Sequence, residues 1–184
     1  MNILRFKKKR TVSAYKNSDH IVANSNYTKD LMQESLNISY KKIHVIHPGI
    51  DIYEDFISIE DEIKIKRVIN GKSPVITTLA RVEKRKGHKF ILNALSEVKK
   101  EFPNIMYLIA GQGPYLEEIK SYSKNLGLEK HIQFLGWITE PEKSLILKNS
   151  DLFVMTPNIV GESVEGFGMS FIDASFHGVA SVGP

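Results

Sequence analysis

The sequence contains no cysteine, so neither disulfides nor thiolate metal sites can contribute to its stability or chemistry. It has no apolar run near the roughly 18 residues of a membrane-spanning helix. Its first ten residues, MNILRFKKKR, lack the hydrophobic core of a secretory signal. It also lacks an Asp-x-Asp pair, internal repeats and low-complexity runs. These absences favour a soluble protein, and we expect it in the cytoplasm.

What is present matches an ordinary globular chain. Of its 184 residues, 42% are hydrophobic and 25% are charged. The formal charge of +4 and the pI near 9.1 suit phosphate-bearing ligands or an anionic membrane face. Nucleic acid is not an expected partner. The basic run at residues 7–10 is typical of a solvated terminus, with peripheral contact at the cytoplasmic membrane face as the alternative.

Predicted strands alternate with predicted helices along most of the chain. Apolar runs indicate strands near residues 20–24, 42–46, 74–80, 105–111, 131–136, 151–157 and 179–183. Amphipathic or capped segments lie between them, at residues 26–36, 88–102, 114–127, 137–150 and 169–177. This rhythm predicts an α/β fold with a Rossmann-like parallel sheet flanked by helices.

The same pattern predicts how the chain divides. Residues 1–51 hold a βαβ fragment that ends in a Pro-Gly turn, which we interpret as part of an amino-terminal domain. Residues 52–72 are charged and form the expected linker, with a helix at 59–68. Residues 73–184 form the main domain. Within it, the helix at 88–102 is expected to pack on the sheet through Phe90, Ala94, Leu95, Val98 and Phe102.

The stretch from Gly161 to Gly178, GESVEGFGMSFIDASFHG, sets two carboxylates around a glycine-rich turn. Gly168 allows a backbone conformation in which a ligand approaches the amides at the start of a helix. Along a helix, Glu165 and Asp173 would lie roughly 12 Å apart, whereas glycosidase carboxylates lie about 5 to 9.5 Å apart. The spacing favours two contacts on a long ligand. A capping acid before a surface helix is the alternative.

The loop RVEKRKG follows the predicted strand at 74–80 and carries several cations. It lies at the carboxyl end of the strand, where open α/β sheets bind their ligands. Its arginine and lysine side chains are suited to neutralising a diphosphate leaving group. A solvent-facing charged loop is the alternative.

Two further turns are weaker candidates. Gly111 and Gly113 form a lone Gly-x-Gly motif after a strand, which by itself is poor support for nucleotide binding. The loop from Gly136 to Ile138 contains the single tryptophan, Trp137. The sequence leaves open whether Trp137 packs in the core or against a ligand.

The segment EGFGMSFID resembles the signature of the family 4 (group 1) retaining glycosyltransferases of the GT-B fold. The resemblance implies that Glu165 and the amides of Phe167, Gly168 and Met169 hold a donor sugar. It further implies that Asp173, one methylene shorter than the family's glutamate, holds the ribose.

The resemblance extends over the rest of the chain, from about Ser18 to Pro184. It implies that Arg81 and Lys86 contact the donor diphosphate, so that Glu165, Arg81 and Lys86 are the catalytic candidates. Gly111 would lie beside the site, and the nucleotide base would pack on the loop of Gly136 and Trp137.

The resemblance implies a hexosyltransferase that uses a UDP or GDP sugar, keeps the anomeric configuration and acts on a saccharide or lipid-linked acceptor in cell-envelope polysaccharide biosynthesis. No cofactor or catalytic metal is expected, and His44 and His47 are interpreted as strand and turn residues. A separate chain could supply the amino-terminal domain. The rival hypothesis is a noncatalytic nucleotide-binding or interaction module.

Overall fold

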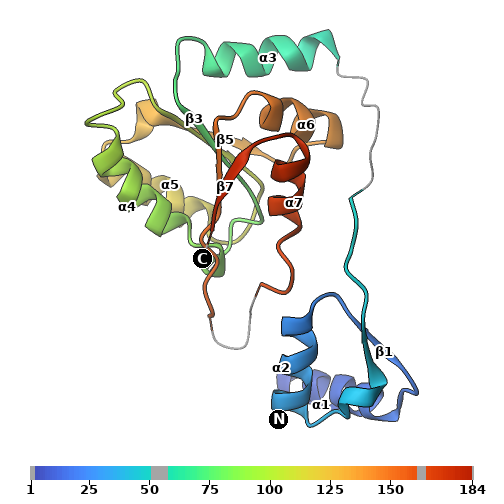
Figure 1. Cartoon of the computed structure of the whole chain (residues 1–184). Coiled ribbons are helices and arrows are strands. Elements are labelled where there is room, and N and C mark those ends of the chain that lie inside the picture. The colour runs from blue at the N-terminus through green and yellow to red at the C-terminus, as the bar shows by residue number, and fades with distance from the viewer. Residues whose placement is uncertain (1–2, 51–57, 161–164, 184) are drawn as a thin grey trace. The chain divides into compact units, whose positions relative to one another are not determined.

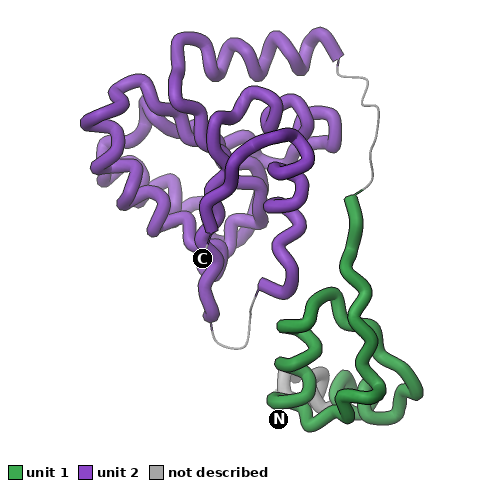
Figure 2. Tube along the Cα trace, viewed as in Figure 1, with its two compact units in different colours: residues 1–50 green, residues 51–184 purple. Residues whose placement is uncertain are grey.

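The chain forms two compact units, Met1–Ile50 and Asp51–Pro184, called unit 1 and unit 2 (Figure 2). The computed structural model describes residues 3–50, 58–160 and 165–183, with side chains from residue 10 onward. The first part of the predicted linker, most of the basic run at 7–10 and the GESV opening of the glycine-rich stretch therefore lie outside the description.

Unit 1 contains the predicted βαβ fragment. Strands β1 and β2 pair in parallel, with Ile21 opposite Ile43. Helix α2 begins at the cap residue Ser25, whose hydroxyl accepts a hydrogen bond from the Thr28 amide, and it ends at Asn37 in the left-handed conformation. The elements are α1 (Ile3–Asn17), β1 (Ile21–Ala23), α2 (Asn26–Leu36), η1 (Tyr40–Lys42) and β2 (Ile43–Val45).

Unit 2 is built on a parallel sheet of five strands in the order β5-β4-β3-β6-β7 (Figure 1). The strands are β3 (Val75–Leu79), β4 (Met106–Ala110), β5 (Ile132–Gly136), β6 (Leu152–Val154) and β7 (Ala180–Val182). The helices are α3 (Ile59–Ile69), α4 (His88–Val98), α5 (Leu116–Asn125), α6 (Glu140–Lys148) and α7 (Met169–Phe176), with the short turns η2 (Lys84–Lys86) and η3 (Glu129–His131). The predicted Rossmann-like α/β fold is confirmed.

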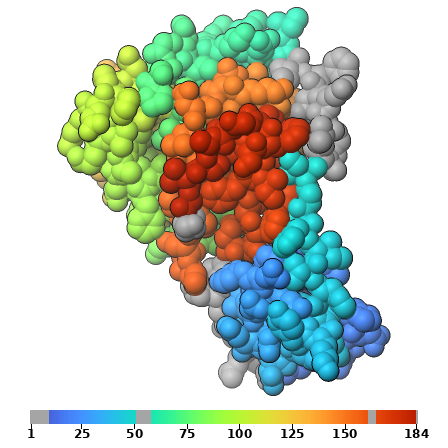
Figure 3. Space-filling model, in the orientation of Figure 1, coloured from blue at the N-terminus to red at the C-terminus, as the bar shows by residue number. Residues whose placement is uncertain are grey.

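Helices cover both faces of this sheet. Helices α4 and α5 lie on one face, where Leu92 and Ile119 pack against Tyr107 of the sheet. The other face is covered by α3, α6 and α7. In the space-filling view, α6, α7 and β7, coloured orange to red, form much of the visible face of unit 2 (Figure 3). A parallel sheet covered in this way buries its strands, and β3 and β4 are buried along their whole length.

The packing face of α4 differs from the predicted one. Its buried residues are His88, Ile91, Leu92 and Leu95, whereas Phe90 is 59% exposed and Val98 and Phe102 are also exposed. Positions 88, 91, 92 and 95 are spaced so that they fall on one face of the helix. Phe90 lies outside that face. Of the predicted face only Leu95 is buried, and Ala94 is exposed as well; the prediction gave two phenylalanines more weight than the aliphatic stripe.

Central strand β3 is fixed by polar contacts as well as by apolar packing. The hydroxyls of Thr78 and Tyr107 are 2.8 Å apart between adjacent strands, and burial raises the pKa of Tyr107. At the start of the strand, the Asp151 carboxylate accepts a hydrogen bond from the Val75 amide at 2.7 Å. Both buried hydroxyls therefore have hydrogen-bond partners, and these contacts fix the position of β3. The loop that follows starts from this fixed strand.

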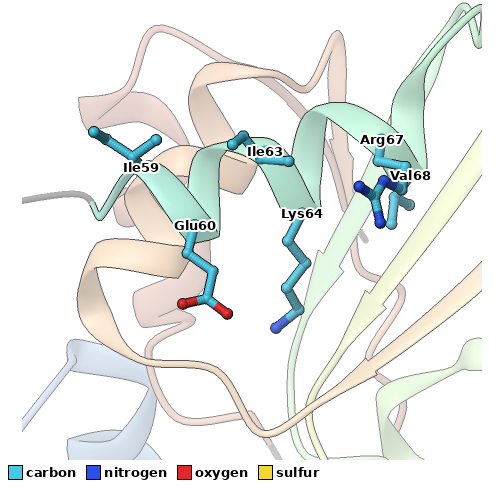
Figure 4. Close-up of a pocket in the computed structure, with 6 residues that line it drawn as sticks. All are labelled: Ile59, Glu60, Ile63, Lys64, Arg67 and Val68. Atoms are coloured by element: carbon cyan, nitrogen blue, oxygen red, sulfur yellow. The ribbon is translucent and has the colours of Figure 1, made fainter.

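Helix α3 lies in the segment predicted as a linker, and it packs on unit 2. Ile65 is buried, and the Lys64 ammonium lies 2.9 Å from the Glu142 carboxylate of α6. A groove of about 690 Å³ runs beside α3, and Figure 4 shows Glu60 and Lys64 pointing to the same side of the helix. Its described lining residues are Ile59, Glu60, Ile63, Lys64, Arg67 and Val68. None of these is a predicted site residue.

Candidate functional site

The strand order of unit 2 places a crevice at one defined point of the sheet. From β3 the chain adds β4 and β5 on one side, then returns to add β6 and β7 on the other. Open α/β sheets bind ligands at such a reversal, beside the carboxyl ends of the strands. Here those ends belong to β3 and β6. The predicted cationic loop follows β3, and the glycine-rich stretch with Glu165 follows β6.

The loops after β3 and β6 are joined by backbone contacts. The Asn158 amide donates to the Arg85 carbonyl at 2.7 Å, and the Thr156 hydroxyl donates to the Gly87 carbonyl at 3.1 Å. Gly87 has φ 75°, and a Cβ there would lie 1.9 Å from the Thr156 carbonyl oxygen. Only glycine fits this approach. The position of the Lys86 side chain is therefore set by tertiary contacts.

Charged side chains from both loops form one alternating chain, which we call the loop cluster: Arg81, Glu83, Arg85, Lys86 and Glu165. Glu83 lies 3.0 Å from Arg81 on one side and 3.0 Å from Arg85 on the other. Arg85 also lies 3.0 Å from the Oε2 of Glu165, and the Lys86 ammonium contacts the same oxygen. The structure thus brings together the three predicted catalytic candidates in one network.

Burial and charge act in opposite directions on Glu165. Partial burial works to raise the pKa of this carboxyl, but hydrogen bonds and charge from Lys86 and Arg85 outweigh it and hold the pKa below its usual value. Glu165 is therefore a carboxylate at neutral pH. The Lys86 ammonium is nearly buried, and its other contact is the Met155 sulfur at 3.8 Å. A cation in such an apolar setting requires an anion beside it.

The predicted helix start at the glycine-rich turn is confirmed. Gly168 has φ 79° and precedes α7, which begins at Met169. The Ser170 hydroxyl donates to the Leu79 carbonyl at 2.7 Å, so the first turn of α7 is tied to the carboxyl end of β3. Amides at the start of a helix favour a negative or hydroxyl-rich ligand. The structure places this helix start beside the end of β3.

Asp173, the candidate for a ribose contact, already has a partner. Its carboxylate lies 2.9 Å from the ammonium of Lys143 on α6, and Lys143 also lies 2.6 Å from Glu140. Burial works to lower the pKa of Lys143, but hydrogen bonds with Glu140 and Asp173 outweigh it and raise the pKa. We call Lys143 and Asp173 the helix pair, because they join α6 to α7.

The two weaker candidate turns lie at the ends of β4 and β5. The Gly111 amide donates to the Gly136 carbonyl at 2.7 Å, and a Cβ on Gly111 would lie 1.9 Å from the Ala80 carbonyl oxygen. Gly111 is therefore required for close strand packing. Trp137 is 72% exposed, which excludes the core position and leaves its indole available to a ligand.

Sequence reasoning missed two residues of this region. Arg85 links Glu83 to Glu165, and the run of three cations in EKRKG was the available signal. His88 is fully buried, and neither of its ring nitrogens has a hydrogen-bond partner. Burial, aided by the positive charge of Lys86, lowers the pKa of His88 to about 4. No feature of the sequence distinguished this histidine from a surface residue.

No group of three or more His, Cys, Asp or Glu side chains in the described ranges is arranged to hold a metal ion. The exposed His20 and His44 instead pair with each other at 2.9 Å, and His47 lies 3.1 Å from the Asn24 carbonyl oxygen. Of the helices in the described part of the chain, none has the length and apolar character needed to span a bilayer.

Fold and site together define a doubly wound α/β protein with a cation–carboxylate cluster at its switch point. The family model for glycosyl transferases group 1 matches residues 59–183, and the model for glycosyltransferase family 4 matches residues 2–54. The chain belongs to the group 1 glycosyl transferases.

Two relatives illustrate the family. The chain is 29% identical over 170 residues to the GDP-mannose-dependent alpha-(1-6)-phosphatidylinositol monomannoside mannosyltransferase of Mycolicibacterium smegmatis, which covers 90% of this chain and 44% of that protein. It is 28% identical over 141 residues to the alpha-monoglucosyldiacylglycerol synthase of Streptococcus pneumoniae, covering 74% and 32% of the two chains. The chain thus spans less than half the length of these relatives.

Solved structures show the same fold at lower identity. The chain matches Anabaena HepE in complex with UDP-glucose with a TM-score of 0.79 and 22% identity, covering 97% of this chain and 48% of that one. It matches WaaG, a glycosyltransferase of lipopolysaccharide biosynthesis, with a TM-score of 0.79 and 13% identity, covering 100% and 49%. These likenesses support the GT-B type of fold.

Proposed function

We propose that this chain is the donor-binding part of a glycosyltransferase that transfers a hexose from a nucleoside-diphosphate sugar to a hydroxyl acceptor. The observation that carries the proposal is the loop cluster at the switch point of the sheet. It joins cations for a diphosphate to a carboxylate for a sugar. The membership in the group 1 family agrees with this chemistry.

The three catalytic candidates would have different roles because their charges differ. Arg81 is 72% exposed on its side chain and can turn toward a phosphate without unburying any surface. Lys86 offers a compact ammonium to the same group, and the two cations would stabilise the negative charge that develops on the leaving diphosphate. Glu165 is ionised and would accept hydrogen bonds from the sugar hydroxyls.

The remaining candidates would hold the rest of the donor. Amides from Phe167 to Met169, at the start of α7, face charge or hydroxyls. Asp173 would bind the ribose, and Trp137 would pack against the base, beside Gly111 and Gly136. The relative from Mycolicibacterium smegmatis is GDP-mannose-dependent, and the similar HepE structure contains UDP-glucose. We therefore propose a UDP or GDP sugar.

The resemblance to retaining glycosyltransferases is the ground for proposing retention of the anomeric configuration. We propose that the reaction needs no metal, since two side-chain cations would serve the diphosphate. The acceptor is proposed to be a saccharide or a lipid-linked glycan of cell-envelope biosynthesis, reached from the cytoplasm or its membrane face. Relatives named for phosphatidylinositol and diacylglycerol acceptors support this choice.

Calorimetric titration of the chain with UDP, GDP and their hexose conjugates tests donor binding. We expect one nucleotide to bind and its sugar conjugate to bind more tightly. Incubation of the same chain with the preferred donor and with lipid or saccharide acceptors, followed by mass spectrometry, tests transfer. Proton NMR of a product would show whether the anomeric configuration is kept. The absence of binding by every nucleotide would contradict the proposal.

The second candidate function is a nucleotide-binding module without catalysis. The specific observation that favours it is that every residue of the loop cluster belongs to unit 2, so that nucleotide binding would need no other part of a protein. Binding of donor without transfer to any acceptor, even when a polypeptide carrying the rest of an acceptor domain is added, would support the module. Transfer that requires the added polypeptide would support a divided enzyme.

A further inference from the structure

The two cations beside Glu165 contact the same oxygen of its carboxylate. In the described part of the chain, every ion pair of Glu165 is made by Oε2, which contacts both Arg85 and Lys86. The other oxygen, Oε1, is left for a ligand. Without a ligand, Arg85 and Lys86 therefore both neutralise the same carboxylate oxygen.

Binding of a diphosphate would draw one of these two cations away from Glu165. Lys86 is the compact cation of the two, and in the described part of the chain the other contact of its ammonium is the Met155 sulfur at 3.8 Å. A diphosphate carries more charge than one carboxylate, so it competes strongly for an ammonium. When Lys86 turns to the phosphate, Arg85 remains as the cation beside Glu165.

Arg85 is held in place for that task. Its Nε donates to Glu83 and its Nη1 to Glu165, each at 3.0 Å, while its carbonyl accepts from the Asn158 amide at 2.7 Å. Its side chain is only 20% exposed. Two ion pairs on different nitrogens fix the orientation of this guanidinium toward Glu83 and Glu165.

We propose that Arg85 is a positioning residue, which keeps the Glu165 carboxylate ionised and aimed at the donor sugar after Lys86 has moved to the diphosphate. This inference rests on the proposed function for the identity of the ligand. It assigns the two neighbouring cations to different halves of the donor: Lys86 acts on the nucleotide diphosphate, and Arg85 acts on the sugar through Glu165.

The test compares two affinities in each variant: that for the nucleoside diphosphate and that for its sugar conjugate. Their ratio measures the contribution of the sugar. We expect Arg85→Gln to lower this ratio about tenfold, the loss expected for a contact with a charged group, and to change the diphosphate affinity less than threefold. Lys86→Met should weaken both ligands in parallel. Arg85→Lys should recover part of the ratio, because it restores the charge near Oε2.

Arg67→Gln is the matched control, since it removes the same charge from the exposed face of α3, and it should change neither affinity. Two results would overturn the inference. One is an Arg85→Gln variant that loses diphosphate affinity as strongly as Lys86→Met. The other is an unchanged sugar ratio in a folded Arg85→Gln protein.

A measurement without ligand separates this inference from the proposed function. Carbon NMR of labelled glutamate carboxyls reports the titration of Glu165, whose pKa should rise in Arg85→Gln and stay in place in Arg67→Gln. If the wild type binds none of the nucleotides, the proposed function fails, while this titration still decides whether Arg85 holds the carboxylate. An unchanged titration of Glu165 in Arg85→Gln overturns the positioning role by itself.

Discussion

Glu165 and Asp173 both contact a lysine, but the two lysines come from different kinds of structure. Lys86 lies on a loop at the carboxyl end of β3, in the loop cluster. Lys143 lies within α6, in the helix pair. A cation on a loop at the switch point can move to a ligand, whereas a cation within a helix that also pairs with Glu140 stabilises packing.

This difference indicates that the two carboxylates of one motif have different duties in the ligand-free protein. Glu165 belongs to an arrangement that can exchange partners. Asp173 also joins α6 to α7, where His177 adds a hydrogen bond to Ser144 at 2.9 Å. A ribose must therefore compete with Lys143 for Asp173. The following changes break or sharpen this comparison.

The largest effect is expected when the loop cluster loses its phosphate cations. Two charge-assisted contacts contribute about 1.5 to 3 kcal/mol each, so the double variant Arg81→Ala, Lys86→Ala should bind UDP or GDP about 10² to 10⁴ times more weakly. Calorimetric titration measures this. The control is Lys66→Ala, Arg67→Ala on α3, which should bind as the wild type does. Equal affinities in the wild type and the loop variant would contradict the site.

The second effect is on the stability of the fold, and it concerns His88, the buried residue that follows the loop of Lys86. His88 has a pKa of about 4 in the folded protein and about 6.5 when unfolded. The unfolded chain thus binds one more proton between these values, and stability falls as the pH drops from about 6.5 toward about 4. At pH 5 the loss from this group is about 2 kcal/mol.

Replacement of His88 by leucine tests that assignment through urea unfolding at several pH values. The variant should be more stable than the wild type below pH 6, and its advantage should grow by about 2 kcal/mol between pH 7.5 and pH 5. It should also be no less stable at pH 7.5, because it removes two unpartnered nitrogens from the core. A constant difference between the two proteins at all pH values would show that His88 is not buried in the neutral form.

A smaller effect on nucleotide affinity is expected at Asp173, the second carboxylate of the glycine-rich stretch. If Asp173 leaves Lys143 to hold the ribose, a 2′,3′-dideoxy nucleoside diphosphate should bind about tenfold more weakly than the ordinary one, the loss of about one net contact with a carboxylate. Asp173→Asn should remove most of this discrimination. Lys143→Met should keep it or increase it, since the competing cation is gone. A wild type that does not distinguish the two nucleotides would leave Asp173 with only its contact to α6.

The smallest effect is expected at Trp137. Stacking of a base on an exposed indole contributes about 1 kcal/mol, so Trp137→Ala should weaken nucleotide binding about fivefold. Trp137→Phe should retain most of the affinity because it keeps an aromatic face. Fluorescence quenching of the single tryptophan by nucleotide offers an independent readout in the wild type. Unchanged fluorescence and affinity would exclude a base contact.

The sequence by itself determined the elements and their order from β1 onward, whereas helix α1 (Ile3–Asn17) was not predicted. The apolar run of β3 appears in the structure where it was predicted, and the capped segment predicted at 137–150 contains α6, which begins with a Thr139–Glu142 capping box. These signals are local, because helix caps, glycine turns and apolar periodicity depend on residues a few positions apart. The place of Arg81 and Lys86 at a strand end also followed from such signals.

Only the tertiary structure decided which neighbours each side chain has. Glu165 meets Arg85 across a sequence separation of 80 residues, and Asp173 meets Lys143 across 30. No periodicity predicts such pairs, because they depend on the strand order that brings the ends of β3 and β6 together. The same holds for the exposed Trp137. Local chemistry selected the elements, and long-range packing assigned the partners on which the proposed site depends.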